Sequence, residues 1–385
     1  DTNMRWINVL HFYQPPLSSN DFVLEAAKLS YKRWAKALLT HPEAKITLNF
    51  SGCLLERLLD LDQEELIANW QKLVARGQVE LLGSAYWHAL LPKITRDEVA
   101  CQVAAQEKML AKVFKIKHPS GFFAPELAYS PELLVWLAGR GYSYAVVDEI
   151  HIGGTLNQPK QVFYQDEGSG MMVAVRQREW SQKYPPEALA AKINYPEILL
   201  TATDGELYGL RHLDMRGNLE KCLADNSLEK LTVSEAMAIS PHPIANIVAA
   251  SWESWPSELK AKEPYAIWDD RSNKIQQKLW SLANLAQQAA IHFKGDANQE
   301  WVLRHLHWGL ASCAWWWASN RDFVLFGGRA WNPEEIIRGA EQLTRSVRSI
   351  MDPRSQPWKR EADKIFCSLQ AKVWREHWRR WPEFK

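Results

Sequence analysis

The stretch Leu199-Leu-Thr-Ala-Thr-Asp204-Gly-Glu206 is an apolar run of strand length that ends in two acids. A second run, Gly121-Phe-Phe-Ala-Pro-Glu126, also ends in a carboxylate. In a chain that alternates strands with helices, an acid at a strand end faces the mouth of a parallel sheet or barrel, where catalytic groups usually lie. The two stretches therefore predict a parallel sheet that presents a pair of carboxylates at one end, an arrangement suited to cleaving a glycosidic bond.

Apolar runs of strand length recur between segments of helical periodicity. The predicted strands are 6–10, 46–50, 79–82, 121–123, 144–147, 171–175, 198–203 and 247–250. The predicted helices among them include 22–39, 53–76, 96–114 and 131–140. This alternation predicts an α/β domain with a parallel sheet and helices outside it, and seven or eight strands suggest closure into a barrel.

The pattern changes near residue 271, where long helical segments replace the strands. The predicted helices of this part are 274–293, 300–319, 333–351 and 358–378. We therefore expect a catalytic barrel over residues 1–270, followed by a C-terminal α-helical bundle domain over residues 271–385. Because no Gly/Ser-rich linker separates the two, we expect the bundle to pack on the barrel and contribute to its cleft.

The composition favours a neutral, carbohydrate-like partner. The 20 tryptophans are roughly four times the usual number for 385 residues, and indole rings stack on the apolar faces of sugars. Lys and Arg total 46 and Asp and Glu total 45, so the net charge of +1 creates no field that attracts nucleic acid or an anionic membrane. An oligosaccharide or polysaccharide substrate fits this balance, and nothing in the sequence indicates an oligomeric state.

Cysteine usage and the lack of targeting signals predict a cytoplasmic protein. The five cysteines are odd in number and show no CxxC spacing, which is typical of reduced thiols rather than of a disulfide framework or a zinc site. They are Cys53, Cys101, Cys222, Cys313 and Cys367. No long apolar run and no secretory pattern at the N-terminus are present in the sequence.

Glu126 and Asp204 are the candidate catalytic acids. Glu126 follows Pro125, whose ring fixes the local backbone and orients the carboxylate; the competing interpretation is a glutamate at a helix start. Asp204 ends a run too apolar to carry a charge unless it opens into a cavity, and Gly205 permits a sharp turn beside it. The alternatives there are a plain Asp-Gly turn, or Glu206 as the catalytic acid.

Other strand ends carry groups that suit a sugar site. His11 and Gln14 follow the first strand, and Glu80, Trp87 and His88 lie in or after the third. Imidazole, amide and indole groups together provide hydrogen bonds to hydroxyls and a surface for a sugar ring, although a single histidine in such a place is more often structural.

Trp252 and the run 315–317 are expected to form part of the cleft wall. Successive side chains of a helix point about 100° apart, so one or two rings of the run at most face one sugar. We expect Trp316 to be one of them.

The order of these motifs resembles glycoside hydrolase family 57. The resemblance is carried by His11…Gln14-Pro15, Gly77-Gln-Val-Glu80, Gly121-Phe-Phe-Ala-Pro-Glu126, Thr203-Asp204-Gly-Glu206 and the Trp-rich segment 306–320. It implies an incomplete (β/α)7 barrel followed by a C-terminal helical domain. It also implies a retaining α-glycosidase that acts on α-glucans such as starch, glycogen or maltooligosaccharides, without a metal or another cofactor.

The resemblance also implies roles for individual residues. Glu126 corresponds to the nucleophile and Asp204 to the general acid/base, with their carboxyl groups roughly 5 to 7 Å apart, near the separation of retaining enzymes. The residues that line the subsite at the scissile bond would be His11, Gln14, Glu80, Trp87, His88 and Asp148. Arg176 belongs to an Arg…Ser element beside the site.

The sequence departs from the family pattern in two places. Tyr13 stands where the family usually has a histidine, and Gly209 is followed by Leu210-Arg211-His212, where many relatives place His directly after the glycine. These changes leave the acid pair intact. They leave the identity of the sugar and the linkage open.

Several other functions fit parts of the pattern. An α-glucan transferase, a branching enzyme or an α-galactosidase would use the same site, although the chain is short for a transferase. A metal-dependent deacetylase or mannosidase-like enzyme could use Asp148, His151 and His11, but the sequence lacks a His-x-His at the first strand. A non-catalytic carbohydrate-binding protein is the remaining alternative.

Overall fold

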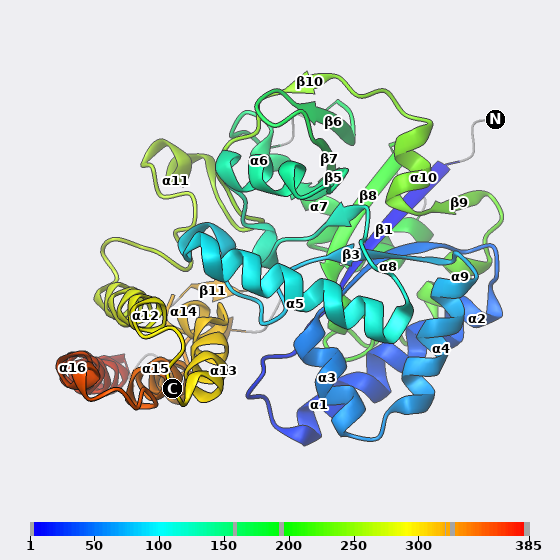
Figure 1. The fold of residues 1–385 in the computed structure, drawn as a ribbon. Coiled ribbons are helices and arrows are strands. Elements are labelled where there is room, and N and C mark those ends of the chain that lie inside the picture. Colours follow the sequence, from blue (N-terminus) through cyan, green and yellow to red (C-terminus); the bar gives the residue numbers. More distant parts are fainter. Residues whose placement is uncertain (1–3, 157–159, 192–195, 320, 324–327, 381–385) are drawn as a thin grey trace. The chain divides into compact units, whose positions relative to one another are not determined.

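The computed structural model describes residues 4–156, 160–191, 196–319, 321–323 and 328–380 (Figure 1). The chain divides into two compact units. The first comprises Asp1–Tyr86 and Cys101–Pro256, and the second comprises Trp87–Ala100 and Ser257–Lys385. The predicted domain boundary between residues 270 and 271 lies inside the second unit.

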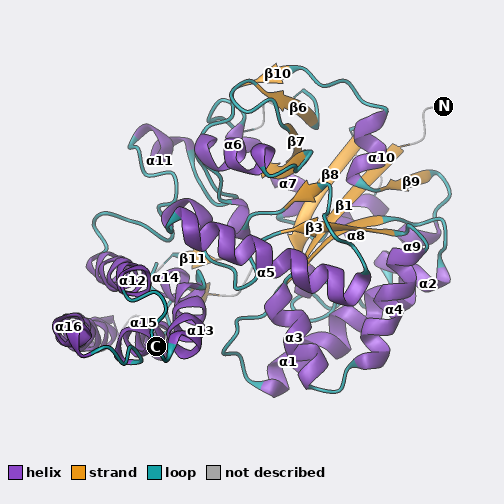
Figure 2. Cartoon of the chain, viewed as in Figure 1, coloured by secondary structure: helices purple, strands orange, loops and turns teal. Residues whose placement is uncertain are grey.

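A curved sheet of parallel strands forms the centre of the first unit (Figure 2). Among the described residues, its parallel strands follow the order β8-β1-β2-β3-β4-β5-β7. Their bounds are β1 Met4–Phe12, β2 Ile46–Phe50, β3 Val79–Gly83, β4 Gly121–Phe122, β5 Tyr144–Asp148, β7 Met172–Arg176 and β8 Ile198–Asp204. The sheet is the incomplete (β/α)7 barrel that the sequence predicted. In the described part of the chain no ladder joins β7 to β8, although the Gln177 N–H, just after β7, donates to the Leu200 carbonyl at 2.9 Å.

Short strands extend this sheet, and none of them was predicted. β6 (Phe163–Asp166) pairs antiparallel with β7, β10 (Ile244–Ala245) pairs with β6, and β9 (Leu228–Leu231) pairs with β1. The strand predicted at 247–250 is wrong. Its residues form isolated bridges to the loops that follow β4 and β5, so these apolar side chains are buried against loops rather than in a ladder.

Helices of the first unit follow the strands and bury their apolar faces. Their bounds are α1 Asn20–Ala26, α2 Lys32–Thr40, α3 Gly52–Asp60, α4 Glu64–Ala75, α5 Arg96–Phe114, α6 Pro131–Gly139, α7 Arg178–Ser181, α8 Pro185–Ala190, α9 Asn218–Ala224 and α10 Val233–Ala238. The first turn of α5 belongs to the second unit, and α5 lies in the first unit from Cys101 onward. A π-helical turn, Ala27–Tyr31, joins α1 to α2. α6 begins at a proline, and the Ser130 side chain accepts a hydrogen bond from the Leu133 N–H, as a helix start requires.

Aromatic side chains fill the space between the central strands and these helices. The ring of Phe12 lies 4.4 Å from that of Tyr31 and 5.3 Å from those of Phe50 and Trp70. All four side chains are buried. Since each such ring removes a large apolar surface from water, this cluster anchors β1 and β2 to the helices beside them.

A buried ion triad spans the open side of the barrel. Asp148 at the end of β5 binds Arg176 and Arg178, with one nitrogen of each 2.6 Å from a carboxylate oxygen. Arg176 also donates to the Ala202 carbonyl on β8 at 2.9 Å, and Arg178 to the Ser254 carbonyl at 2.8 Å. Burial acts to raise the pKa of Asp148, but the two guanidinium groups hold it below its ordinary value. The triad therefore links β5, β7 and β8 with the segment 251–255.

The second unit is helical, as predicted. Its helices are α11 Pro256–Lys260, α12 Lys274–His292, α13 Gln299–Leu310, α14 Cys313–Trp317, α15 Pro333–Arg348 and α16 Gln356–Arg380, with a short hairpin of β11 Asp322–Phe323 and β12 Gly328–Arg329. The helix predicted over 300–319 is interrupted at Ala311, whose extended backbone forms a bridge to Ala89. In the described parts of the chain, no helix is both long and apolar enough to cross a membrane.

We expect Asp148→Asn to destabilise the first unit by about 3–5 kcal/mol, because it leaves two buried guanidinium groups without a counter-charge. Arg176 and Arg178 are only 5% and 4% exposed, so water cannot replace the lost carboxylate. Denaturant unfolding measures the change. Asp62→Asn makes the same chemical change at an exposed site, where the left-handed backbone suits asparagine, and is expected to change stability by less than about 0.5 kcal/mol. Equal effects of the two variants would contradict the role of the triad.

Candidate active site

Glu126 occupies a strained turn directly after β4. Its backbone angles, φ 61° and ψ 15°, lie in the left-handed region, which costs a non-glycine residue about 1–3 kcal/mol. The hydroxyl of Tyr129 stabilises the turn, because it accepts from the Ala124 N–H at 2.9 Å and donates to the Phe122 carbonyl at 3.1 Å. Strain of this kind is frequent at functional sites, and here it sets the direction of a carboxylate.

Trp252 donates two hydrogen bonds to Glu126. Its indole Nε1–H donates to Oε2 of Glu126 at 3.1 Å, and its backbone N–H donates to the Glu126 carbonyl at 3.1 Å. Tyr129 and Ala250 exchange two further backbone hydrogen bonds, at 3.0 and 3.2 Å. The sequence predicted Trp252 in the cleft wall, and the structure adds that it is a hydrogen-bond donor to the candidate nucleophile.

His11 lies next to Asp204 in the sheet and contacts Trp252, the residue that donates to Glu126. Its ring stacks on Phe123 at 4.8 Å and meets the Trp252 ring edge-on at 6.3 Å, and in the β1–β8 ladder it is the partner of Asp204. Nδ1 lies 2.6 Å from Oδ1 of Asn49, an oxygen that only accepts, so Nδ1 carries the hydrogen. Burial lowers the pKa of His11, and the imidazole is therefore neutral near pH 7.

Asp204 is the last residue of β8, at the same sheet end as Glu126. Oδ2 of Asp204 lies 2.7 Å from Nη1 of Arg211. The short turn that follows β8 brings Arg211 back to the end of this strand. A side chain at position 205 would lie 2.1 Å from the Phe12 ring, so only glycine fits after the acid. Close packing against Phe12, rather than a positive φ, is therefore what requires glycine between Asp204 and Glu206.

Glu206 is a third acid of the site and is only 2% exposed. Its Oε1 accepts from Nε2 of Gln14 at 3.1 Å and from the hydroxyl of Tyr31. Burial, followed by the negative charge of Asp204, raises the pKa of Glu206 to about 7. The predicted residue Gln14 therefore reaches the acids through Glu206.

Asp148 and Arg176 form part of the buried triad, and Asp148 is fully enclosed. The guanidinium carbon of Arg176 lies 5.1 Å from the centre of the Trp252 ring. This cation–π contact joins the triad to the residue that donates to Glu126. Glu80 is the second residue of β3 and accepts hydrogen bonds from the side chains of Ser234, Tyr144 and Thr47. A contact between Glu80 and substrate stays a prediction.

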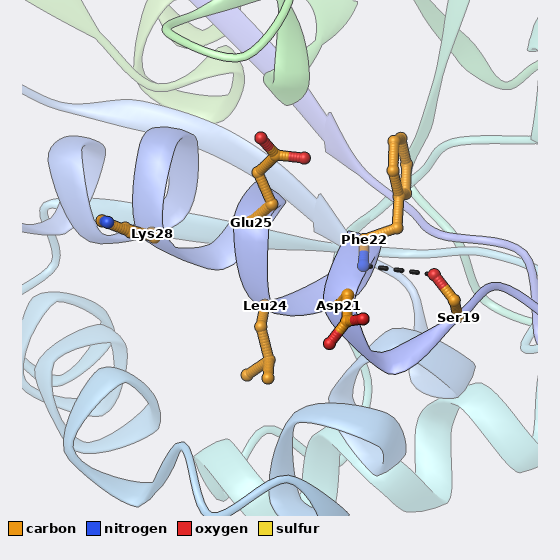
Figure 3. A pocket seen from close by; sticks show the side chains of 6 residues that line it. All are labelled: Ser19, Asp21, Phe22, Leu24, Glu25 and Lys28. Atoms are coloured by element: carbon orange, nitrogen blue, oxygen red, sulfur yellow. Dashed lines mark hydrogen bonds between the residues drawn. The ribbon is translucent and has the colours of Figure 1, made fainter.

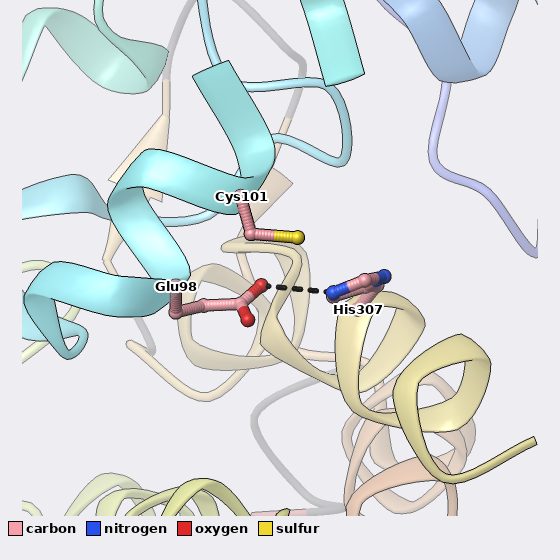
Figure 4. Close-up of side chains that lie close together, drawn as sticks. All are labelled: Glu98, Cys101 and His307. Atoms are coloured by element: carbon pink, nitrogen blue, oxygen red, sulfur yellow. Dashed lines mark ion pairs between the residues drawn. The ribbon is translucent and has the colours of Figure 1, made fainter. Parts of the chain in front are cut away.

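Three predicted site residues, Trp87, His88 and Trp316, belong to the second unit. The Trp87 ring stacks at 3.9 Å on that of His307, whose Nε2 lies 3.3 Å from Oε1 of Glu98 (Figure 4). These contacts place Trp87 in a polar and aromatic cluster of the second unit.

His88 has a left-handed backbone, with φ 62°, and its Nδ1 lies 3.0 Å from the Ser312 hydroxyl. Trp316 packs edge-on against Trp317 at 4.5 Å, whereas Trp315 is buried and stacks on Trp280 at 4.3 Å. Trp315 is therefore a packing residue. The contribution of Trp87, His88 and Trp316 to a cleft stays a prediction.

Glu253 is a residue of the site region that the sequence analysis missed. Burial raises its pKa, while the guanidinium groups of Arg176 and Arg178 act in the opposite direction and Asp204 adds a like charge. The sequence signal for it is an acid between Trp252 and Trp255, directly after an apolar run.

A surface hollow elsewhere on the first unit contains none of the candidate residues (Figure 3). It is lined by Ser19, Asp21, Phe22, Leu24, Glu25 and Lys28. These residues lie on or next to α1, and the Ser19 hydroxyl accepts a hydrogen bond from the Phe22 N–H as a helix cap.

The family profile described as Glycosyl hydrolase family 57 matches residues 10–248, which include every candidate of the first unit except Trp252 and Glu253. The chain belongs to glycosyl hydrolase family 57. The family resemblance expected from the motifs is thereby confirmed.

Relatives and solved structures agree with this membership. The family 57 chain is 28% identical over 215 residues to α-amylase 1 of Dictyoglomus thermophilum, covering 52% of this chain and 31% of that protein. It is 28% identical over 170 residues to a 4-α-glucanotransferase of Thermococcus kodakarensis, covering 43% and 25%. The matches thus span less than a third of either relative's length.

The fold of the chain also resembles that of a family 57 branching enzyme from Pyrococcus horikoshii. The TM-score is 0.68 at 15% identity, and the match covers 96% of both chains.

We expect Glu206→Gln to flatten the dependence of stability on pH in this family 57 chain. The folded-state pKa of about 7 lies above the ordinary value of 4.5, so the folded protein retains a proton that the unfolded chain releases. The free energy of unfolding of the parent protein should therefore decrease as pH rises between about 4.5 and about 7. Urea unfolding at several pH values in this interval measures the slope, and the exposed Glu167→Gln is the control. Identical slopes in the parent and in Glu206→Gln would contradict the assignment.

Proposed function

We propose that this chain is a retaining α-glycoside hydrolase that acts on α-glucans such as starch, glycogen or maltooligosaccharides. The proposal rests on one path of contacts, from Glu126 through Trp252 and His11 to Asp204. The path brings both acids to the carboxyl ends of parallel strands, where barrel enzymes perform chemistry. Membership of family 57, and relatives named α-amylase, support this choice of reaction.

In the first step, the carboxylate of Glu126 attacks the anomeric carbon, and the hydrogen bond from Trp252 keeps it aimed. Asp204 gives its proton to the glycosidic oxygen, the bond to the leaving sugar breaks, and a glycosyl ester of Glu126 remains. In the second step, ionised Asp204 removes a proton from water, whose oxygen attacks the anomeric carbon and releases Glu126. Two displacements restore the original configuration.

The remaining residues would bind the sugar. Neutral His11 and Gln14 offer hydrogen bonds to hydroxyls, and we include Trp87, His88 and Trp316 of the second unit as cleft residues on the strength of the motif resemblance. A neutral carbohydrate partner, rather than nucleic acid or a membrane, agrees with the net charge of +1. A cytoplasmic location is part of the proposal, and it agrees with five cysteines that form no disulfide.

The contacts of Asp148 and His151 favour a reaction without a metal at that position. Both carboxylate oxygens of Asp148 are bound by guanidinium groups. Burial lowers the pKa of His151 to about 4, so its neutral ring accepts at Nδ1 from the Asp148 N–H at 3.2 Å and donates from Nε2 to the Ala250 carbonyl at 3.0 Å. These side chains are therefore occupied in holding the fold. Activity that survives exhaustive chelation is the expected result.

Transfer of the glycosyl group is the second candidate. Relatives of the chain carry the names 4-α-glucanotransferase and branching enzyme, and a sugar hydroxyl in place of water would complete the same second step. Incubation with maltooligosaccharides, pullulan, glycogen and aryl α-glucosides and α-galactosides, with a labelled acceptor sugar, separates the possibilities. Reducing ends without labelled product indicate hydrolysis, and labelled oligosaccharides indicate transfer.

Glu126→Ala and Asp204→Ala should each lower kcat/KM on α-glucans by roughly a thousandfold or more, because each removes one of the two acids. With an aryl α-glucoside whose leaving group departs without receiving a proton, sodium azide should restore turnover in both variants, with products of opposite configuration. Asp204→Ala should yield the α-glycosyl azide, since azide attacks the ester of Glu126. Glu126→Ala should yield the β-glycosyl azide, since azide attacks the substrate directly. NMR distinguishes the two anomers.

The exposed Glu167→Ala serves as the control for both variants and should retain parental activity. The assignment would be overturned by the same anomer from both alanine variants, or by parental activity in either one. A crystal structure with a bound oligosaccharide would also measure the separation of the two carboxyl groups, expected at roughly 5 to 7 Å.

Trp252→Phe should lower kcat/KM roughly tenfold or more, because it keeps an aromatic ring but removes the N–H that donates to Glu126. Trp255→Phe changes a tryptophan of the same segment that is 49% exposed, and it should have little effect. Steady-state kinetics on an aryl α-glucoside make the comparison. Equal kinetics for the two variants would show that the hydrogen bond does not aim the nucleophile.

A further inference from the structure

Arg211 lies beside the candidate acid/base at a place where the sequence departs from its family pattern. Nη1 of Arg211 is 2.7 Å from Oδ2 of Asp204. The two side chains are 36% and 22% exposed, so the ion pair borders the opening of the site rather than the core. The position belongs to the Leu210-Arg211-His212 sequence that replaces the histidine expected after Gly209.

The loop that carries Arg211 is rigidly held over the strand end. The Arg211 N–H donates to the Glu206 carbonyl at 2.9 Å, and the His212 N–H donates to the Leu207 carbonyl at 3.1 Å. Gly209 has a φ of 107°, and a Cβ atom there would lie 2.3 Å from the Leu29 carbonyl oxygen. The backbone hydrogen bonds therefore fix the position of Arg211 relative to Asp204. Most surface ion pairs lack such support and lose side-chain entropy when they form.

The flank of the loop is anchored as well. Nε2 of His212 lies 2.9 Å from Oε1 of Glu187, and its ring stacks on Tyr184 at 4.3 Å. These contacts hold the residue next to Arg211 to α8 and the loop before it. A change of the Arg211 side chain alone would leave the anchors of the loop intact.

The ionisable groups around Asp204 come from four elements. His11 on β1 is neutral because burial lowers its pKa, and Glu206 on the turn after β8 has a pKa raised to about 7. Glu253, in the segment after residue 250, is a further, half-buried acid with a raised pKa. Arg211 is the positive group in direct contact with Asp204, against three neighbouring groups that are neutral or acidic.

We propose that Arg211 is a positioning residue that directs the carboxyl group of Asp204 and favours its ionised form. The inference rests on the proposed function, in which Asp204 must give a proton in the first step and accept one in the second. A guanidinium group at hydrogen-bond distance stabilises a carboxylate, so it assists the second step and opposes the first. Arg211 therefore sets the pH range over which the two steps proceed.

The first experiment compares Arg211→Gln, which removes the charge, with Arg211→Lys, which keeps it. Arg211→Met, which keeps the aliphatic stem, is a second neutral variant. In both neutral variants, the alkaline limb of the pH profile of kcat/KM on an aryl α-glucoside should move up by about one pH unit. This expected shift of the limb is small because the Arg211–Asp204 ion pair is partly exposed to water, which screens the charge of Arg211. Arg211→Lys should restore most of the parental profile.

Substrates with a dinitrophenolate leaving group isolate the second step, because such a group leaves without receiving a proton and deglycosylation then limits kcat. The acid limb of this kcat profile should also move to higher pH in the neutral variants. A purely structural role of Arg211 would lower kcat at all pH values without moving either limb. Arg216→Gln, at an exposed position of the same segment, is the matched control and should leave both limbs in place.

A titration of the substrate-free protein tests the inference without turnover. The 13C NMR signal of the Asp204 side-chain carboxyl, assigned by its loss in Asp204→Asn, should titrate about one pH unit higher in Arg211→Gln than in the parent. An unchanged midpoint, or an equal shift in Arg211→Lys or Arg216→Gln, would overturn the inference. Failure of the parent chain to cleave or transfer any α-glycoside would instead overturn the proposed function and leave the titration result standing.

Discussion

The buried triad of Asp148, Arg176 and Arg178 is the interaction on which the rest of the first unit depends. The barrel ladder is open between β7 and β8, and Arg176 crosses this gap to the Ala202 carbonyl. Arg178 reaches the carbonyl of Ser254 and so fixes the segment beside Glu126. Three charged groups withdrawn from water are stable only as a complete set. The triad therefore constrains three strands and one functional segment at the same time.

The strained turn at Glu126 depends indirectly on the ion triad. A left-handed glutamate persists only where its surroundings leave no alternative, and here the Tyr129 hydroxyl and the Trp252 hydrogen bonds supply that restraint. Trp252 lies in the segment whose Ser254 carbonyl is bound by Arg178. The ion triad thus supports the direction of the Glu126 carboxylate through the intervening segment.

The candidate acids occupy different electrostatic environments, as a two-step mechanism requires. Glu126 receives an indole N–H, a contact that favours a carboxylate. Asp204 shares its surroundings with Glu206, whose pKa is raised to about 7, and with the guanidinium group of Arg211. The negative charge of Asp204 thus adds to burial in raising the pKa of Glu206.

Apolar periodicity along the chain was enough to predict the repeating strand and helix order, the parallel barrel and the two acids at the strand ends, because it reports which side of an element is buried. It did not determine the short strands such as β9, or the failure of 247–250 to form a strand, since both depend on partners distant in the chain. The tertiary structure alone decided that Trp252 donates to Glu126 and that Arg211 meets Asp204. The first contact joins segments far apart in the chain, and the second depends on a specific turn. In both cases packing, rather than the local preference of the residue, sets the direction of the side chain.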